Sequence, residues 1–262
     1  MQYKTLLFDV RDNVAYITLN RPEAANSINL ELAKELMYAT MHCIYEPAIR
    51  AVVLTGAGSM FCSGGDLKSF STQGENLPYH LRELTTYLHV AISRLTRMDL
   101  PVIAAVNGSA AGAGMPLALA CDIVIAAESA SFTMAYTRIG LTPDGSSTYF
   151  LPRLVGLNRA LELVLTNRVL SAQEALEWGM VTRVVPDADL PAQAHALAAQ
   201  LAAGPTRALG LSKRLLRGSY TETLETQMER ESQGIASMAY TTDAGEGITA
   251  FLNKRTAAFR GE

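Results

Sequence analysis

Two glycine-rich segments hold the backbone groups best suited to chemistry in this sequence. They span residues 55–66 and 106–116 and include Gly65 and Ala113. Glycine adopts backbone angles that other residues resist and lets a ligand approach the main chain closely. Small residues around Gly65 and Ala113 could therefore leave two N–H groups bare. Two such donors facing one oxygen atom form an oxyanion hole, which stabilises negative charge developing on a carbonyl oxygen.

Each segment alone fits an ordinary tight turn without a ligand equally well. Neither completes the G-x-G-x-x-G fingerprint of a dinucleotide site, and no acidic residue follows at the proper distance. The sequence also contains no Walker lysine motif and no G-x-S-x-G nucleophile elbow. A helix beginning near Met115 would place the positive end of its dipole beside the second glycine-rich segment, where it would favour negative charge. Pro116 suits the first turn of such a helix, because its missing N–H has no partner there.

One carboxylate, Asp144, lies in the segment Leu-Thr-Pro-Asp-Gly-Ser at residues 141–146. Pro-Asp-Gly is a common turn signature in which the aspartate bonds its own backbone, so the residues alone leave a structural role open. No metal site is expected, because the histidines and cysteines have no partners at metal-ligand spacing. We predict packing or surface roles for the four histidines, His42, His80, His89 and His195, and a buried packing role for Cys62.

Apolar strands alternate with amphipathic helices in the first part of the sequence. We predict helices at 30–44, with Asn29 as N-cap, and at 81–98, and strands at 14–19, 51–55, 102–106, 122–126 and 131–134. This order favours parallel strands joined by crossover helices, with both glycine-rich segments at the carboxyl-end edge of one sheet. From about residue 146 the pattern is mostly helical, over 158–178, 189–217 and 221–258. We expect an α/β core over 1–190 and a C-terminal helical region over 191–262.

The composition of the 262 residues, 49% hydrophobic and 18% charged, is typical of a globular protein. A net charge of −3 without a long basic run argues against a nucleic-acid partner. The most apolar stretch, residues 102–127, is interrupted by Asn107, Pro116 and Asp122, so a buried core is favoured over a membrane span. Three widely spaced cysteines and an N-terminus without a secretory pattern indicate a cytoplasmic location.

Together, and in this order, the motifs resemble the crotonase (enoyl-CoA hydratase/isomerase) superfamily over nearly the whole chain. The matching segments are residues 20–27, 55–67, 101–114, 121–123, 139–141, 151–156, 175–179 and 251–255. The resemblance implies an α/β fold of the ClpP/crotonase type, a spiral of strand-strand-helix units followed by C-terminal helices that form a homotrimer or homohexamer. It implies an acyl-coenzyme A substrate and no separate cofactor, because coenzyme A is part of that substrate.

The resemblance also assigns site residues. It makes the N–H groups of Gly65 and Ala113 the oxyanion donors. It implies contacts to coenzyme A or substrate from Ala24, Asn26, Ser63, Gly64, Asp66, Leu67, Gly114, Pro116, Tyr136, Phe251 and Lys254. For Asp66 a structural role is favoured, and Phe251 and Lys254 would contribute from the C-terminal helix, across a subunit boundary. The segment 68–80 is expected to cover the acyl pocket.

The kind of reaction is inferred from two positions at which family hydratases have glutamates that hold and activate water. These positions align with Pro116 and Tyr136, and neither side chain is a general base near neutral pH. Asp144 matches the position of an acid in family isomerases and in a related dehalogenase, and its Gly-Leu-x-Pro-Asp pattern is most similar to bacterial isomerases of phenylacetate degradation. The resemblance therefore implies an isomerase, of the double-bond-shift or epoxide-to-oxepin type, with Asp144 as acid and base. A hydratase or other crotonase reaction, and a non-catalytic acyl-CoA-binding subunit, remain as alternatives.

Overall fold

Parallel strands form the larger of two sheets in the computed structural model, which describes residues 3–262. Its strands lie in the order β1 (Leu6–Arg11), β2 (Val14–Leu19), β3 (Ala51–Gly56), β5 (Val102–Val106), β7 (Ile123–Ala127) and β10 (Arg183–Val185). All neighbours are parallel except the hairpin of β1 and β2. The continuously apolar β5 is buried at every residue, as a strand covered on both faces must be.

A second, smaller sheet runs beside the first. Its strands are only two or three residues long and lie in the order β4 (Met60–Cys62), β6 (Ser109–Ala111), β8 (Ser131–Thr133) and β9 (Leu170–Ser171). Each of β3, β5 and β7 is followed by one short strand of this sheet. The α/β spiral of strand-strand-helix units is therefore confirmed. The segments predicted as continuous glycine-rich turns each contain a short strand, β4 or β6, that helical or alternating patterns could not reveal.

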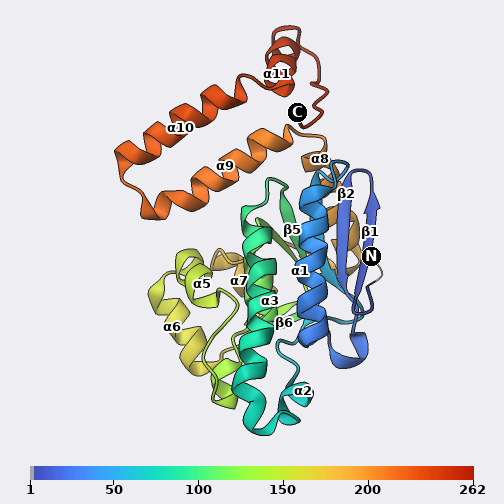
Figure 1. The fold of residues 1–262 in the computed structure, drawn as a ribbon, viewed down its shortest axis with the longest axis vertical. Coiled ribbons are helices and arrows are strands. Elements are labelled where there is room, and N and C mark those ends of the chain that lie inside the picture. Colours follow the sequence, from blue (N-terminus) through green and yellow to red (C-terminus); the bar gives the residue numbers. More distant parts are fainter. Residues whose placement is uncertain (1–2) are drawn as a thin grey trace.

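Helices fill the spaces around the two sheets. The helix α1 (Leu30–Tyr45) begins at Asn29, whose side chain accepts a hydrogen bond from the Leu32 N–H at 2.9 Å, as predicted. It packs along α3 (Leu77–Arg97), which begins four residues before the predicted helix (Figure 1). The short helices α2 (Leu67–Ser71) and α4 (Gly114–Leu119) each follow one of the two glycine-rich turns.

The second half of the chain is helical but more divided than predicted. Its helices are α5 (Ser147–Val155), α6 (Leu157–Thr166), α7 (Ala172–Glu177), α8 (Leu190–Ala202), α9 (Thr206–Gly218), α10 (Leu224–Met238) and α11 (Thr242–Leu252). Asn167, with φ 52°, ends α6, and β9 separates α6 from α7. None of the helices formed by residues 3–262 combines the length and hydrophobicity that crossing a bilayer requires.

The last three helices form an arm that extends away from the sheets (Figure 1). By contrast, α8 contacts β2, β3, β5 and β7, although it follows the predicted boundary at residue 190. Its buried side chains Leu190, Ala194 and Ala198 belong to the main core. The division into regions 1–190 and 191–262 stays a prediction.

A partly buried carboxylate ties the arm to the core. Asp122, directly before β7, lies 2.6 Å from Lys213 Nζ and 2.9 Å from Arg217 Nη2, both on α9. Burial lowers the pKa of the Lys213 ammonium, and the charge of Asp122 opposes that shift. Lys213 also donates to the carbonyls of Leu95 and Leu100. Asp122 thus compensates two cations at the junction of arm and sheet.

We predict that Asp122→Asn lowers the free energy of unfolding by about 3 kcal/mol, because two partly buried cations lose their counter-charge while the side-chain shape is kept. Urea unfolding followed by far-ultraviolet circular dichroism measures this. The matched control Asp9→Asn removes a carboxylate 3.9 Å from Arg11 on the exposed β1 and should change stability by less than about 0.5 kcal/mol. Equal effects of the two substitutions would contradict the anchoring role.

Candidate active site

The two glycine-rich turns are in direct contact at the carboxyl ends of β3 and β5. These strands are parallel neighbours, with Val52 opposite Val102 and Leu54 opposite Ala104. Gly64 has φ +100°, and a Cβ added there would lie 3.0 Å from the Ala111 oxygen and 3.2 Å from the Ala113 nitrogen. Only glycine allows both this angle and this approach. The predicted convergence of the turns is present.

Gly65 and Ala113 have free N–H groups in this arrangement. Within residues 3–262, neither donates a hydrogen bond to a protein acceptor, whereas Asp66 and Gly112 do. The Asp66 N–H donates to the Ile28 carbonyl at 3.0 Å, and the Gly112 N–H donates to the Thr133 carbonyl at 3.1 Å. Because buried backbone donors are nearly always satisfied, two unpaired N–H groups beside a cavity are typical of a ligand site.

Both residues line a cavity of about 740 Å³, here called the Asp144 cavity. Of the predicted site residues, it brings together Gly65, Ala113, Ser63, Leu67, Tyr136 and Asp144. The segment 68–80 contributes Phe70 and Pro78 to its wall, next to Leu81, Leu84 and Leu88 of α3. Asp144 is the one carboxylate among its lining residues in the described part of the chain. The cavity is thus apolar with a few polar groups, as small-molecule sites usually are.

Asp144 is paired with a histidine that the sequence analysis assigned to packing or the surface. His89 Nε2 lies 2.9 Å from Asp144 Oδ1, and both residues line the cavity. The Asp144 side chain therefore does not bond its own backbone, and its carbonyl closes the turn by accepting from the Ser147 N–H and hydroxyl. His89 lies one helical turn after Thr85, which also lines the cavity. Residues four positions apart share a face of a helix, so the spacing of the two residues was the sequence signal that could have placed His89 on this face.

Pro116 and Tyr136 surround the Asp144 turn without supplying a base. A Cβ added to Gly145, which has φ +64°, would lie 3.3 Å from Pro116 Cγ, so the buried proline packs behind the turn. The Tyr136 hydroxyl is buried without a hydrogen-bond partner among residues 3–262. Burial, and then the charge of Asp144, raise the Tyr136 pKa, so this phenol stays neutral.

Two predicted contact residues have evident structural partners. Asn26 is fully buried, and its side chain bonds the Ala57 and Met60 carbonyls and the Arg21 N–H. Asp66 caps α2 and lies 2.8 Å from Arg21 Nη2. Burial alone would raise the Asp66 pKa, but the Ser69 N–H and the Arg21 guanidinium lower it below its usual range. Both side chains fix the first glycine-rich turn.

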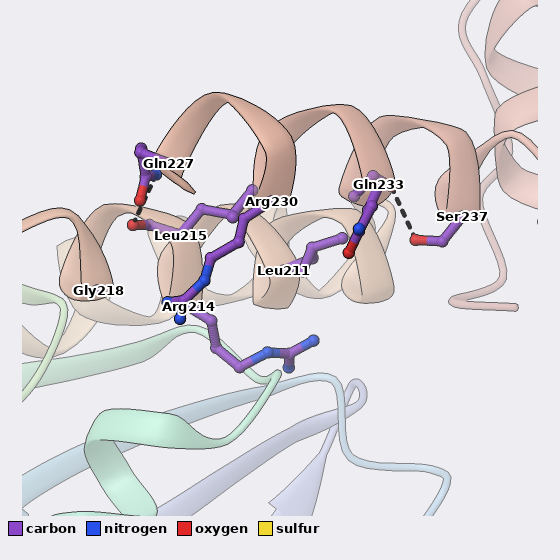
Figure 2. Close-up of a pocket in the computed structure, with 9 residues that line it drawn as sticks. Leu211, Arg214, Leu215, Gly218, Gln227, Arg230, Gln233 and Ser237 are labelled. Atoms are coloured by element: carbon purple, nitrogen blue, oxygen red, sulfur yellow. Dashed lines mark hydrogen bonds between the residues drawn. The ribbon is translucent and has the colours of Figure 1, made fainter. Parts of the chain in front are cut away.

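The remaining predicted residues lie outside the cavity lining. Ala24 ends a short 3-10 helix before Asn26, and Gly64 and Gly114 lie where the two turns meet. Phe251 lies in α11, and Lys254 follows that helix. Phe251 is 84% exposed in the single chain. A separate hollow between α9 and α10, which Figure 2 shows, includes none of the predicted site residues. The roles proposed for Phe251 and Lys254 stay predictions.

Thiol and metal chemistry have little support in the described residues. All three cysteines are free and buried, and burial raises the pKa of the Cys62 thiol to about 12, which keeps it protonated. Across residues 3–262, no group of three or more His, Cys, Asp or Glu side chains is arranged to hold a metal ion.

Comparisons with known proteins give matches over nearly the whole chain. The family model described as enoyl-CoA hydratase/isomerase matches residues 9–262. A protein named "probable enoyl-CoA hydratase" from Rhodobacter capsulatus is 42% identical over 100% of both chains. The 1,2-epoxyphenylacetyl-CoA isomerase of Escherichia coli is 42% identical over 98% of both, and 4-chlorobenzoyl coenzyme A dehalogenase-2 of an Arthrobacter species is 37% identical over 93% of this chain and 88% of the relative.

A solved structure of similar sequence has the same fold. The crystal structure of an enoyl-CoA hydratase from Bacillus anthracis matches 99% of this chain and 100% of its own, with a TM-score of 0.93 and 38% identity.

We predict that Asn26→Ala lowers the free energy of unfolding by about 3 kcal/mol, because it leaves the Ala57 and Met60 carbonyls without their donor. Asn76→Ala is the matched control, since Asn76 is exposed and makes no side-chain cap at α3. Thermal unfolding of the two variants measures the difference. If Asn26→Ala unfolds like the parent, Asn26 does not support the turn.

Proposed function

The chain belongs to the enoyl-CoA hydratase/isomerase family, as its motifs indicated, and within that family we propose that it isomerises an acyl-coenzyme A thioester with Asp144 as acid and base. The observation that carries the proposal is the position of Asp144, which is the one carboxylate among residues 3–262 that lines the same cavity as Gly65 and Ala113. The positions aligned with hydratase glutamates hold Pro116 and the neutral Tyr136.

The mechanism begins with the thioester carbonyl oxygen accepting hydrogen bonds from the Gly65 and Ala113 N–H groups. Asp144 removes a proton from one carbon of the acyl chain, and the electron pair of that C–H bond moves into the enolate, whose charge the two N–H groups stabilise. The Asp144 carboxyl then returns the proton to a different carbon, so the double bond shifts with no other reactant. The apolar walls of the cavity strengthen the two donors because water is excluded.

His89 supports this step by holding the carboxylate. Its Nε2 contacts one oxygen, Oδ1, at 2.9 Å, which leaves Oδ2 for the substrate carbon. A base fixed by a neighbouring side chain starts closer to its reacting geometry, so less conformational freedom is lost in the transition state.

Assembly and location are part of the same proposal. The arm exposes large apolar side chains that a second copy could cover, namely Leu216, Tyr220, Leu224, Met228, Ile235, Tyr240, Ile248, Phe251 and Leu252. Exposed apolar surface of this extent favours association. It is consistent with the predicted homotrimer or homohexamer. The proposal further takes the enzyme as cytoplasmic, with acyl-CoA as its partner and no nucleic acid.

A second candidate is hydrolytic removal of a halide from an aromatic acyl thioester, favoured by the His89–Asp144 contact and the dehalogenase relative. The Asp144 carboxylate would bond to the ring carbon, and chloride would leave with the electron pair of its bond. Water, deprotonated by His89, would then cleave the resulting ester at its carbonyl carbon. That cleavage would regenerate the carboxylate and release a hydroxylated product.

We predict that Asp144→Asn lowers the isomerisation rate of a 3-enoyl-CoA at least about 1000-fold, because the amide cannot take up the proton, while acyl-CoA affinity changes less than about threefold. Absorbance of the conjugated 2-enoyl product and isothermal titration calorimetry give the two quantities. Undiminished turnover excludes Asp144 as the proton carrier. Water addition to 2-enoyl-CoA would favour a hydratase, and binding without turnover of any tested thioester would favour a non-catalytic subunit.

The second candidate has its own assay. Under the isomerase proposal, 4-chlorobenzoyl-CoA releases no chloride at stoichiometric enzyme, because no proton beside the carbonyl is available for transfer. Chloride release that His89→Ala slows at the hydrolytic stage would instead establish the halide reaction.

A further inference from the structure

Two arginine side chains line the Asp144 cavity in addition to the groups of the proposed mechanism. Arg82 comes from α3, and Arg138 comes from the 3-10 helix η3 (Tyr136–Ile139). Asp144 is the one carboxylate among the lining residues of the described chain, and it is already in contact with His89. Because arginine is always protonated in proteins, the lining of this cavity holds two positive charges and one negative charge.

Both guanidinium groups keep donors free for a ligand. Arg82 is exposed, and its side chain makes no hydrogen bond or ion pair with any group of residues 3–262. Arg138 is also exposed, and its Nη2 donates to the Asn167 carbonyl at 2.8 Å, which holds the guanidinium without neutralising it. A guanidinium without a carboxylate partner is suited to binding one, because its N–H groups match the two carboxylate oxygens. The two arginines therefore form an anion site where the cavity opens to solvent.

One face of α3 connects Arg82 with the proton-transfer group. Thr85 and His89 follow Arg82 at spacings of three and four residues, so the three side chains share a helix face, and all of them line the cavity. With a rise of about 1.5 Å per residue, the path from Arg82 to His89 is about 10 Å long. At that distance the charge of Asp144 is largely screened at physiological ionic strength, so it does not cancel the attraction of Arg82 for an anion.

Apolar side chains line the cavity along this path. Leu81, Leu84 and Leu88 come from α3, and Ile139 comes from η3. These side chains, Asp144 and both arginines belong to the lining of one and the same cavity, so a chain of methylene groups can extend from Asp144 to the guanidinium groups within a single volume. The order of surfaces is therefore proton-transfer group, apolar lining, cation.

We propose that Arg82 and Arg138 together bind a carboxylate at the far end of the acyl group, so that the enzyme prefers coenzyme A thioesters whose acyl chain ends in a carboxylate. This rests on the proposed function, in which the thioester carbonyl lies at the two unpaired N–H groups of the cavity. The phosphates of coenzyme A are the other anions that a guanidinium group can bind. The acyl carboxylate is favoured because Arg82 continues the helix face that holds His89 against Asp144, the group that acts on the acyl carbons.

Paired binding measurements isolate the contribution of the terminal carboxylate. Saturated acyl-CoAs, from hexanoyl-CoA to decanoyl-CoA, are compared by isothermal titration calorimetry with the mono-thioesters of the dicarboxylic acids of equal length. Both members of a pair carry the same coenzyme A phosphates, and neither has a double bond to shift, so any difference in affinity comes from the carboxylate. We expect at least one carboxylate-ended thioester to bind about 10-fold more tightly than its neutral partner, as a charge-assisted hydrogen bond provides.

Two double variants of equal charge change locate the effect. Arg82→Gln combined with Arg138→Gln should reduce the preference to less than about threefold, by weakening only the carboxylate-ended thioester. The control, Arg97→Gln combined with Arg207→Gln, removes two exposed arginines that do not line the Asp144 cavity, one of them on α3, and should leave the preference intact. Unchanged affinity for the neutral thioester shows that both variants are folded.

Two results would overturn the proposal. One is equal affinity within every pair of thioesters. The other is equal weakening of both members of a pair by the Arg82 and Arg138 substitutions, which would assign these side chains to the coenzyme A phosphates. Failure of the isomerase proposal shows separately, as undiminished turnover of Asp144→Asn, because the binding comparison involves no chemical step.

Discussion

The close contact between the two glycine-rich turns is the constraint on which the site depends. Gly64 at φ +100° lets the first turn approach the Ala113 nitrogen, and a side chain at that position would push the turns apart. The parallel pairing of β3 and β5 brings the turns to one edge, and the buried Asn26 holds the first of them in place. Two unpaired N–H groups at one cavity follow from these three features together.

Much of the fold follows from local patterns in the sequence. The apolar strands β2, β3 and β5, and the capped helix α1, correspond to the predicted segments because burial and periodicity set them residue by residue. The short strands β4 and β6 could not be predicted in this way. Each has three residues, fewer than a pattern needs, and each is defined by hydrogen bonds to a strand about 50 positions away in sequence.

The site was predictable where backbone chemistry or a family motif marks it. Gly65, Ala113, Tyr136 and Asp144 meet in one cavity, although 79 positions separate the first from the last. His89 was assigned to packing or the surface because it has no partner at metal-ligand spacing, and the helical phase that it shares with Thr85 identifies a face of α3 but no contact. Its importance comes from a contact with Asp144, 55 positions away, that exists only after α3 packs against the Asp144 turn.

The packing of Pro116 against Gly145 has a consequence for which side chains position 116 can hold. A glutamate at position 116 would bring a longer, charged side chain to the place where the proline ring supports the Asp144 turn. We therefore expect a glutamate at position 116 and the present Asp144 turn to compete for the same volume. A Pro116→Glu exchange alone is therefore expected to displace the 144–146 turn and not simply to add a second acid beside Asp144.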